Sequence, residues 1–130
     1  MQIRIKNGLP VVSLTVSYER DSIPLENVLF DTGCAATVFD TDIIASIGIQ
    51  IDFINGIAKR MYGIGGTSEA CYEQLATDLI IDGIHFKTFK LQLGSIQEPY
   101  GFDGILGIDY MQQTGLKVDF EKMSIHYSSM

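Results

Sequence analysis

The chain has 130 residues, of which 46% are hydrophobic and 19% are charged, a composition typical of a globular protein. This length is enough for one domain with a hydrophobic core, so we expect a single domain over residues 1–130. The formal net charge of −7 argues against nucleic acid or an anionic membrane as partner. No apolar run approaches the roughly 18 uninterrupted residues of a membrane span.

Cysteine and histidine are too scarce for a metal site or a disulfide framework. Cys34 and Cys71 allow one disulfide at most, and a reducing cytoplasm is the simplest setting for them. Residues 1–6 alternate polar and apolar side chains, unlike a secretory signal. His85 and His126 stand alone in the sequence. We therefore expect no metal, no cofactor and a cytoplasmic protein.

Apolar residues at every second position predict strands along most of the first half of the chain. The expected strands cover residues 3–5, 12–18 and 25–30, with a turn at Asn7-Gly8 between the first two. Asp40 can cap a short helix that runs through Ile47 and is closed by Gly48.

The second half continues this pattern. Residues 58–61 and a strand from Ser68 onward form two arms of a hairpin, and Asp82-Gly83 marks the next hairpin turn. Beyond it the apolar positions change parity between Phe86 and Phe89, which predicts a β-bulge near Lys87-Thr88.

The remaining elements are short. Residues 94–101 should be a loop, Asp109 should cap a helix that Gly115 ends, and strands should cover residues 116–120 and 123–127. The whole chain is thus expected to be all-β, a closed and mostly antiparallel barrel with one or two short helices.

A carboxylate at the end of an apolar strand is the feature most suggestive of function. Asp31-Thr32-Gly33-Cys34 directly follows Val28-Leu29-Phe30. Burying a carboxylate without partners costs several kcal/mol, so such a residue is usually paired, hydrogen-bonded or needed for chemistry.

Two further segments accompany this motif. A glycine-tipped hairpin contains Tyr62, Gly63, Ile64, Gly65 and Gly66, and a later apolar strand ends in Ile105, Leu106 and Gly107. In this order the three segments resemble the retropepsin-like aspartic peptidases, the single-domain retroviral type. The resemblance implies an acid-protease β barrel that is half of the two-domain pepsin-like architecture.

The resemblance also implies the chemistry. Aspartic peptidases need two carboxylates so close together that they share one proton, and this dyad activates a water molecule. The chain has one Asp-Thr-Gly, since Phe102-Asp103-Gly104 lacks the threonine and reads as a turn that orients the next strand. The second carboxylate is then expected from the Asp31 of a partner subunit, which makes the enzyme a homodimer.

The family gives each flanking segment a role. Thr32 would lock the two active-site loops together, Gly33 would allow their close approach, and the glycine hairpin would act as a flap over an extended peptide substrate. Ile105, Leu106 and Gly107 would support the Asp31 loop. By the same analogy, the terminal strands, at residues 3–5 and 123–127, would leave unpaired edges in a monomer and pair across the twofold axis.

The sequence departs from the family at a few positions. Ala35 and Ala36 replace the acidic residues that retroviral members tend to carry there, and Ile108 replaces an arginine. Cys34 stands where alanine or serine is usual, either as inert packing or as an oxidation switch.

Two other functions remain open from the sequence. One is a peptide-binding dimer on the same fold that does not cleave, and the other is a monomeric structural domain in which Asp31 is a turn residue. The intact Asp31-Thr32-Gly33 favours the aspartic endopeptidase.

Overall fold

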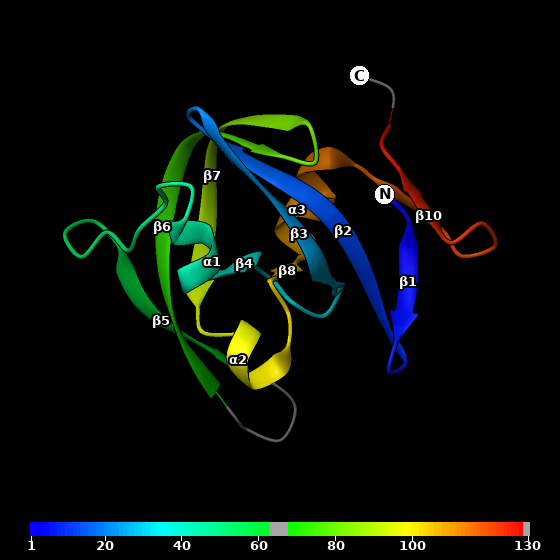
Figure 1. The fold of residues 1–130 in the computed structure, drawn as a ribbon, viewed down its shortest axis with the longest axis horizontal. Coiled ribbons are helices and arrows are strands. Elements are labelled where there is room, and N and C mark those ends of the chain that lie inside the picture. The colour runs from blue at the N-terminus through cyan, green and yellow to red at the C-terminus, as the bar shows by residue number, and fades with distance from the viewer. Residues whose placement is uncertain (63–67, 129–130) are drawn as a thin grey trace.

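The computed structural model describes residues 1–62 and 68–128 and consists mainly of β-strands (Figure 1). The main sheet has the strand order β1-β2-β3-β8-β4-β7-β6-β5, and β9 pairs with β10 in a second, two-stranded sheet. The strands are β1 Ile3–Lys6, β2 Leu9–Tyr18, β3 Asp21–Phe30, β4 Val38–Asp40, β5 Ile57–Tyr62, β6 Ser68–Ile81, β7 Ile84–Gly94, β8 Gly104–Leu106, β9 Lys117–Asp119 and β10 Ser124–His126.

The sheet curls back on itself. Strand β2 pairs with β3 on one side and also with β6, so the hydrogen-bonded path through β3, β8, β4, β7 and β6 returns to β2. Three short helices accompany the strands: α1 Thr41–Ala45, α2 Gln97–Tyr100 and α3 Ile108–Thr114. The all-β fold class is confirmed, with one helix more than expected.

Two hairpin turns form where their residues predicted them. Asn7 and Gly8 connect β1 to β2, and Asp82 and Gly83 connect β6 to β7. All four residues have φ between 51° and 80°, the left-handed conformation that two-residue hairpin turns of type I′ require.

The β-bulge expected near Lys87-Thr88 is wrong. The register of β6 against β7 is the same on both sides of this point, so neither strand carries an extra residue. Asp78, on the opposite strand, instead adopts a φ of +53°. The buried positions change parity in both strands here, between Ala76 and Leu79 in β6 and between Phe86 and Phe89 in β7. The change of parity is therefore shared by the two strands and involves no inserted residue. The register shift that the sheet does contain lies between β2 and β3.

Two helical segments also differ from expectation. The segment expected as a loop contains α2. The buried Asp40 carboxylate explains this helix, because it accepts hydrogen bonds from the N–H groups of Ile96 and Gln97 at 3.1 and 2.9 Å. The same carboxylate caps α1 through the Ile43 N–H. The N-cap of α3 is Gly107 rather than Asp109, whereas Gly115 ends that helix as predicted.

The terminal strands are already paired within one chain. The Ile3 N–H donates to the Met123 carbonyl and the Ile125 N–H to the Met1 carbonyl, both at 2.8 Å, and Ile3 and Ile125 are buried. In Figure 1 β1 and β10 accordingly lie side by side, close to the N-terminus. The expectation that a monomer leaves these edges unpaired is therefore wrong at Ile3 and Ile125, whereas Ile5, farther along the edge strand β1, is exposed.

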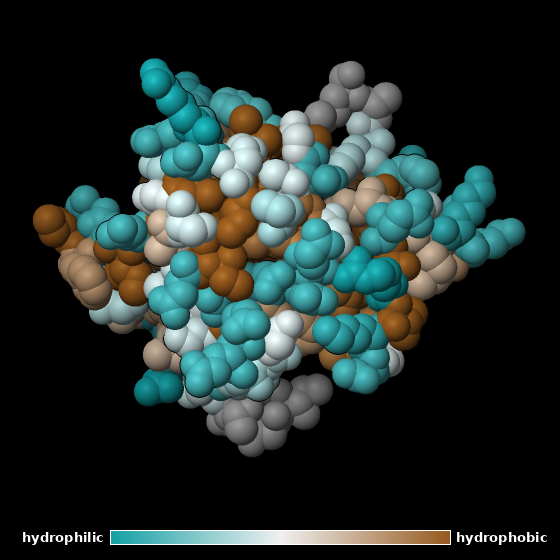
Figure 2. Space-filling model, in the orientation of Figure 1, coloured by the Kyte–Doolittle hydropathy of each residue, from teal (hydrophilic) through white to brown (hydrophobic). Residues whose placement is uncertain are grey.

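The core lies inside the curled sheet and extends to α3. Its fully buried large side chains are Tyr110, Phe39, Phe89, Leu25, Ile44, Leu79, Ile81, Leu91, Leu93, Leu106, Val11 and Val12. Apolar side chains are also exposed at the far end of the molecule from β9 and β10. There the loop before β5 carries Phe53 and Ile54, which are 76% and 91% exposed, and Figure 2 shows hydrophobic atoms at this edge. Among the helices in the described ranges, none is long and apolar enough to cross a membrane.

Candidate active site

Asp31 begins a tight turn at the end of β3. Its N–H donates to the Leu106 carbonyl at 3.0 Å, which fixes the turn against β8. Its Oδ1 accepts a hydrogen bond from the Gly33 N–H at 2.8 Å, and its carbonyl accepts one from the Cys34 N–H at 3.1 Å. Side-chain and backbone bonds of this kind hold an aspartate turn in one conformation.

The segment expected to support this turn does lie against it. Strand β8 runs parallel to β3, with Leu106 opposite Phe30, and the Ile108 N–H donates to the Cys34 carbonyl at 2.8 Å. A Cβ on Gly107 would lie 2.7 Å from the Cys34 carbonyl oxygen and 2.9 Å from that of Ala36. Glycine is required here because the two backbones approach too closely for any side chain.

Sequence reasoning missed a buried pair that joins the two motifs. The Thr37 hydroxyl donates to Asp109 Oδ1 at 2.7 Å and accepts from the Gly107 N–H at 3.1 Å, while the Thr37 N–H donates to Asp109 Oδ2 at 3.0 Å. Thr37 is 0% exposed. The sequence did contain a signal for this pair, because a polar residue stands next to each motif. Thr37 directly precedes the apolar pair Val38-Phe39, and Asp109 comes two residues after Gly107.

Asp103 has the structural role expected for it. Its Oδ2 accepts hydrogen bonds from the N–H groups of Glu26 and Asn27 at 3.1 and 3.0 Å, which ties the start of β8 to β3. It does not line the cleft described below. Asp103 is therefore not a second catalytic carboxylate within the same chain.

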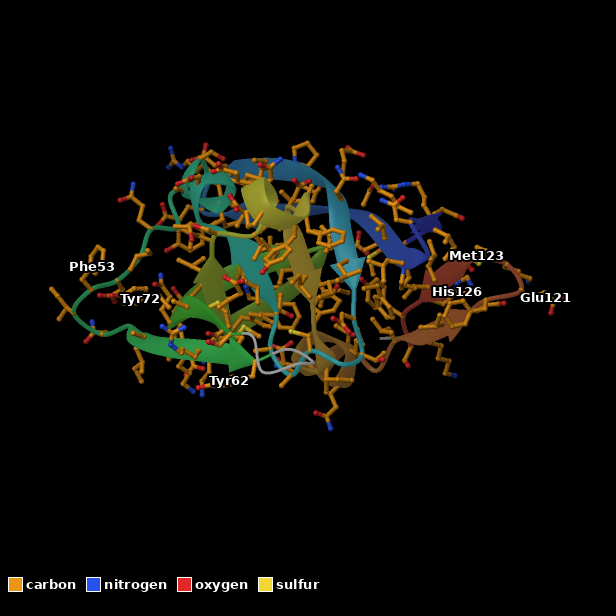
Figure 3. All side chains as sticks on the ribbon, turned by 90° about the horizontal axis from the view of Figure 1, so that it is seen from below. Phe53, Tyr62, Tyr72, Glu121, Met123 and His126 are labelled. Carbon is orange, nitrogen blue, oxygen red and sulfur yellow. The ribbon has the colours of Figure 1, made fainter. Side chains whose placement is uncertain are left out.

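Asp31 lies at the edge of a cleft with a volume of about 890 Å³. One wall is the loop that follows Asp31, and a second is formed by β5 and β6. Tyr100 of α2 and Ile96, the N-cap residue of that helix, also line the cleft. Figure 3 shows Tyr62 at one end of β5 and Phe53 beyond its other end. The two arms of the expected flap hairpin thus border the cleft that contains Asp31.

The expected tip of that hairpin cannot be compared with the structure. Gly63, Ile64, Gly65 and Gly66 lie outside the described residues. Tyr62, the last described residue of β5, is exposed and lines the cleft, and β5 pairs in register with β6 from Ile57 opposite Glu73 to Tyr62 opposite Ser68.

The two cysteines both line the cleft, and both are free thiols. Burial raises the pKa of each thiol, and for Cys34 the nearby Asp31 carboxylate raises it further. The Cys34 Sγ donates to the Ala36 carbonyl at 3.1 Å. Because the thiolate is the reactive form, these surroundings favour inert packing over a redox role for Cys34.

Charged side chains also line the cleft. The Lys59 ammonium lies 2.9 Å from Glu73 Oε2, and this pairing lowers the pKa of the Glu73 carboxyl. Tyr100 donates a hydrogen bond to Glu69 across the cleft. Over residues 1–62 and 68–128, no group of three or more histidine, cysteine, aspartate or glutamate side chains is placed to hold a metal ion.

Comparison with solved structures finds the same fold in retropepsin-like proteases. The EIAV protease in complex with the inhibitor HBY-793 is 22% identical, with a TM-score of 0.60, over 88% of this chain and 95% of that chain. A retropepsin-like aspartic protease from Rickettsia conorii is 14% identical, with a TM-score of 0.60, over 95% of this chain and 96% of that chain.

A third structure, the retroviral protease-like domain of Ddi1 from Leishmania major, is 10% identical with a TM-score of 0.59, over 92% of this chain and 90% of that chain. No protein-family model matches the sequence, and a search of curated proteins gives no match. At these low identities the likeness is one of fold. The chain has the retropepsin-like fold, and it has this fold over nearly its whole length.

Proposed function

We propose that the protein is an aspartic endopeptidase that acts as a homodimer, with one Asp31 from each subunit in the catalytic dyad. The observation that carries this proposal is the position of Asp31 in a braced turn that lines a cleft of about 890 Å³. A carboxylate with only a structural role would not need to face a cleft large enough for a peptide.

The hydrogen bonds of Asp31 leave one oxygen for chemistry. Among the described residues, Oδ1 accepts the Gly33 N–H and Oδ2 has no hydrogen-bond partner. In the proposed dimer the second Asp31 carboxylate and a water molecule would contact this oxygen. Two carboxylates this close cannot both ionise, so one would act as base toward the water while the other donates a proton to the substrate carbonyl.

The loop around Asp31 is suited to contact a second copy. Thr32 and Gly33 are both exposed in the single chain, next to the catalytic carboxylate. In the proposed dimer Thr32 would hydrogen-bond across the twofold axis, and Gly33 would let the two loops approach each other.

The hairpin formed by β5 and β6 would act as the flap. Strand β5 is an edge strand of the main sheet, so its outer backbone groups can pair with an extended peptide lying in the cleft. Alternate side chains of that peptide would then point into the cleft. Closure of the hairpin over the bound peptide would exclude water other than the nucleophile.

Cleavage of a peptide library by the wild type and by Asp31→Asn tests this proposal. The substitution keeps the shape of the side chain and removes its ionisation, so we expect unchanged folding and loss of at least about a thousandfold in cleavage rate. Wild-type activity should be highest in acid and decline toward alkaline pH, as the shared proton is lost.

Three outcomes can be told apart. Comparable cleavage by the variant, or a flat pH profile up to alkaline pH, would contradict the dyad. Peptide binding by the wild type without cleavage would identify the non-catalytic peptide-binding dimer instead. A monomer that neither binds nor cleaves would leave Asp31 as a turn residue.

A further inference from the structure

Part of the cleft lining is a compact polar group. Glu73 on β6 and Gln92 on β7 lie opposite each other in the sheet, and the Gln92 Nε2 donates to Glu73 Oε2 at 2.8 Å. The Lys59 ammonium contacts the same oxygen, and both partners line the cleft together with Gln92. The neighbouring cleft residues are apolar, among them Val38, Cys71 and Ile105.

Two acceptor oxygens in this group lack a hydrogen-bond donor. Gln92 is only 3% exposed, and its Oε1 has no partner within the described part of the chain. Glu73 Oε1 has the Lys90 ammonium nearby, but at 3.9 Å, which is beyond hydrogen-bond distance. An unpaired buried acceptor is uncommon in proteins and costs free energy, so a missing donor is expected at this point.

The same group also offers unused donors. The side chains of Lys59 and Lys90 are 49% and 63% exposed, and each ammonium has three N–H groups. A ligand that fits must therefore supply donors to two oxygens and an acceptor to an ammonium. A primary carboxamide does this, because its NH2 group has two donors and its carbonyl is an acceptor.

We propose that Glu73 and Gln92 form a specificity pocket for a glutamine side chain of the peptide substrate. Its NH2 group would donate to Gln92 Oε1 and Glu73 Oε1, and its carbonyl would accept from Lys59, which lines the cleft. Gln92 lines the cleft, and the terminal torsion of a glutamine is soft, so its amide can turn to present the buried oxygen to a ligand. This proposal rests on the proposed function, since it names a preference of the same cleft.

Other side chains match this polar group less well. An arginine or lysine offers no acceptor and would lie beside two ammonium groups. A glutamate offers no donor, so it would leave both acceptor oxygens unpaired and place its charge next to Glu73. An apolar side chain would bury the same oxygens without any partner, which sites of this kind discriminate against strongly.

The test uses octapeptides in which one position at a time is fixed as glutamine, methionine or glutamate. The glutamine preference is the ratio of the cleavage rate with glutamine to that with methionine, a side chain of similar size. For the wild type we expect a preference of about tenfold or more at one position, and a similar preference over glutamate. Gln92→Leu and Glu73→Leu should each bring this ratio close to one.

Gln113→Leu is the matched control, because Gln113 is exposed on α3 and does not line the cleft. It should keep the wild-type ratio. Thermal melting of each variant checks its folding, and if Gln92→Leu does not fold, the Glu73→Leu ratio decides. A wild type that cleaves peptides without favouring glutamine at any position would overturn the pocket, as would a ratio unchanged in the folded variants.

Binding separates this inference from the proposed function. The same peptides are measured by fluorescence anisotropy on the Asp31→Asn protein, which should bind without cleaving. If the wild type cleaves nothing while this protein still prefers glutamine peptides, the endopeptidase proposal fails and the pocket is supported. If binding shows no such preference, the pocket is rejected whatever the cleavage result.

Discussion

Thr37 shows how one buried hydroxyl holds two distant segments in register. It joins the loop after Asp31 to the start of α3, and the Gly107 N–H depends on it for a hydrogen bond. Asp109 in turn accepts two bonds from Thr37, one from the hydroxyl and one from the backbone. Both active-site motifs therefore rely on a residue that belongs to neither.

Replacing Thr37 by valine should destabilise the protein. The change keeps the shape of the side chain but leaves the buried Gly107 N–H without a partner, which costs about 1–3 kcal/mol. Asp109 Oδ1 also loses one of its two donors and keeps the Tyr110 N–H. Urea unfolding measures this loss, and cleavage should fall as well because the Asp31 loop loses a brace.

Thr88→Val is the matched control for this substitution. Thr88 is exposed on β7, so the free energy of unfolding of Thr88→Val should stay within about 0.5 kcal/mol of the wild-type value. Equal losses in the two variants would show that the Thr37 hydroxyl contributes nothing specific.

Residue roles were predictable where local chemistry decides them. The position of Asp31 after an apolar strand and the capping of α1 by Asp40 both follow from short stretches of sequence, whereas the need for Gly107 comes from its approach to the distant Cys34 and Ala36 carbonyls. The second use of Asp40 at Ile96, and the use of Asp109 by Thr37 rather than as a helix cap, depend on contacts between residues more than fifty positions apart. No local pattern specifies which of several backbone or hydroxyl groups reaches such a carboxylate.

At the scale of elements, turn residues were the reliable signal and strand parity the weaker one. Asn7-Gly8 and Asp82-Gly83 fix both hairpins because only a few residue types adopt their backbone conformation. The parity change along β7 was read as an inserted residue, but the structure accommodates it by Asp78 on the neighbouring strand. A pattern in one strand cannot tell an inserted residue from a parity change that both paired strands share.

The last strand, β10, is followed by a tyrosine that holds it to the core. The Tyr127 hydroxyl donates to Asp82 Oδ2 at 2.7 Å and lies 2.6 Å from the Tyr110 hydroxyl, which also reaches the Ile81 carbonyl. This network connects the C-terminal segment, α3 and the turn between β6 and β7. Burial raises the pKa of both tyrosine hydroxyls, so the folded protein favours their neutral forms.

Tyr127→Phe should lower the free energy of unfolding by about 1 kcal/mol at neutral pH, because Asp82 and Tyr110 each lose a partner. The stability that the raised pKa values provide is complete below the unfolded tyrosine pKa of about 10 and is lost as pH rises above it. Wild-type stability should therefore decline above that pH, and the variant, with one tyrosine fewer, should decline less.

Chemical denaturation at neutral and at strongly alkaline pH measures both effects. Tyr72→Phe serves as the control, since Tyr72 packs edge-to-face against Phe53 and lies outside this network. The free energy of unfolding of Tyr72→Phe should match that of the wild type at both pH values. A gap between wild type and Tyr127→Phe that widens on going to alkaline pH would contradict the role assigned to the buried hydroxyls.

At the scale of the whole molecule, the pairing of the termini decides which surfaces remain for a dimer. Met1 and Ile3 already bond to Ile125 and Met123 of the same chain, so these backbone groups are not free for a partner. The sequence could identify the terminal strands but not their partner, because intrachain and interchain pairing use the same alternating pattern. The exposed residues around Asp31 are the surface on which the proposed dimer depends.

A homodimer with a shared dyad makes a prediction that no monomeric enzyme shares. Each chain carries one Asp31, so dissociation should abolish cleavage, and specific activity should fall as the protein is diluted from micromolar to nanomolar concentration. Sedimentation or mass photometry over the same range should show the dimer disappearing together with the activity.

Mixing wild type with the Asp31→Asn protein makes the test sharper. Exchange of subunits would produce mixed dimers with a single aspartate, so a growing excess of the variant should progressively inhibit a fixed amount of wild type. Thr88→Val combined with Asp31→Asn should inhibit equally, whereas an unrelated acidic protein should not inhibit at all. Wild-type activity that resists both dilution and an excess of the variant would mean that a single chain carries the whole catalytic site. The one Asp-Thr-Gly of this sequence would then have to act without a second copy of itself.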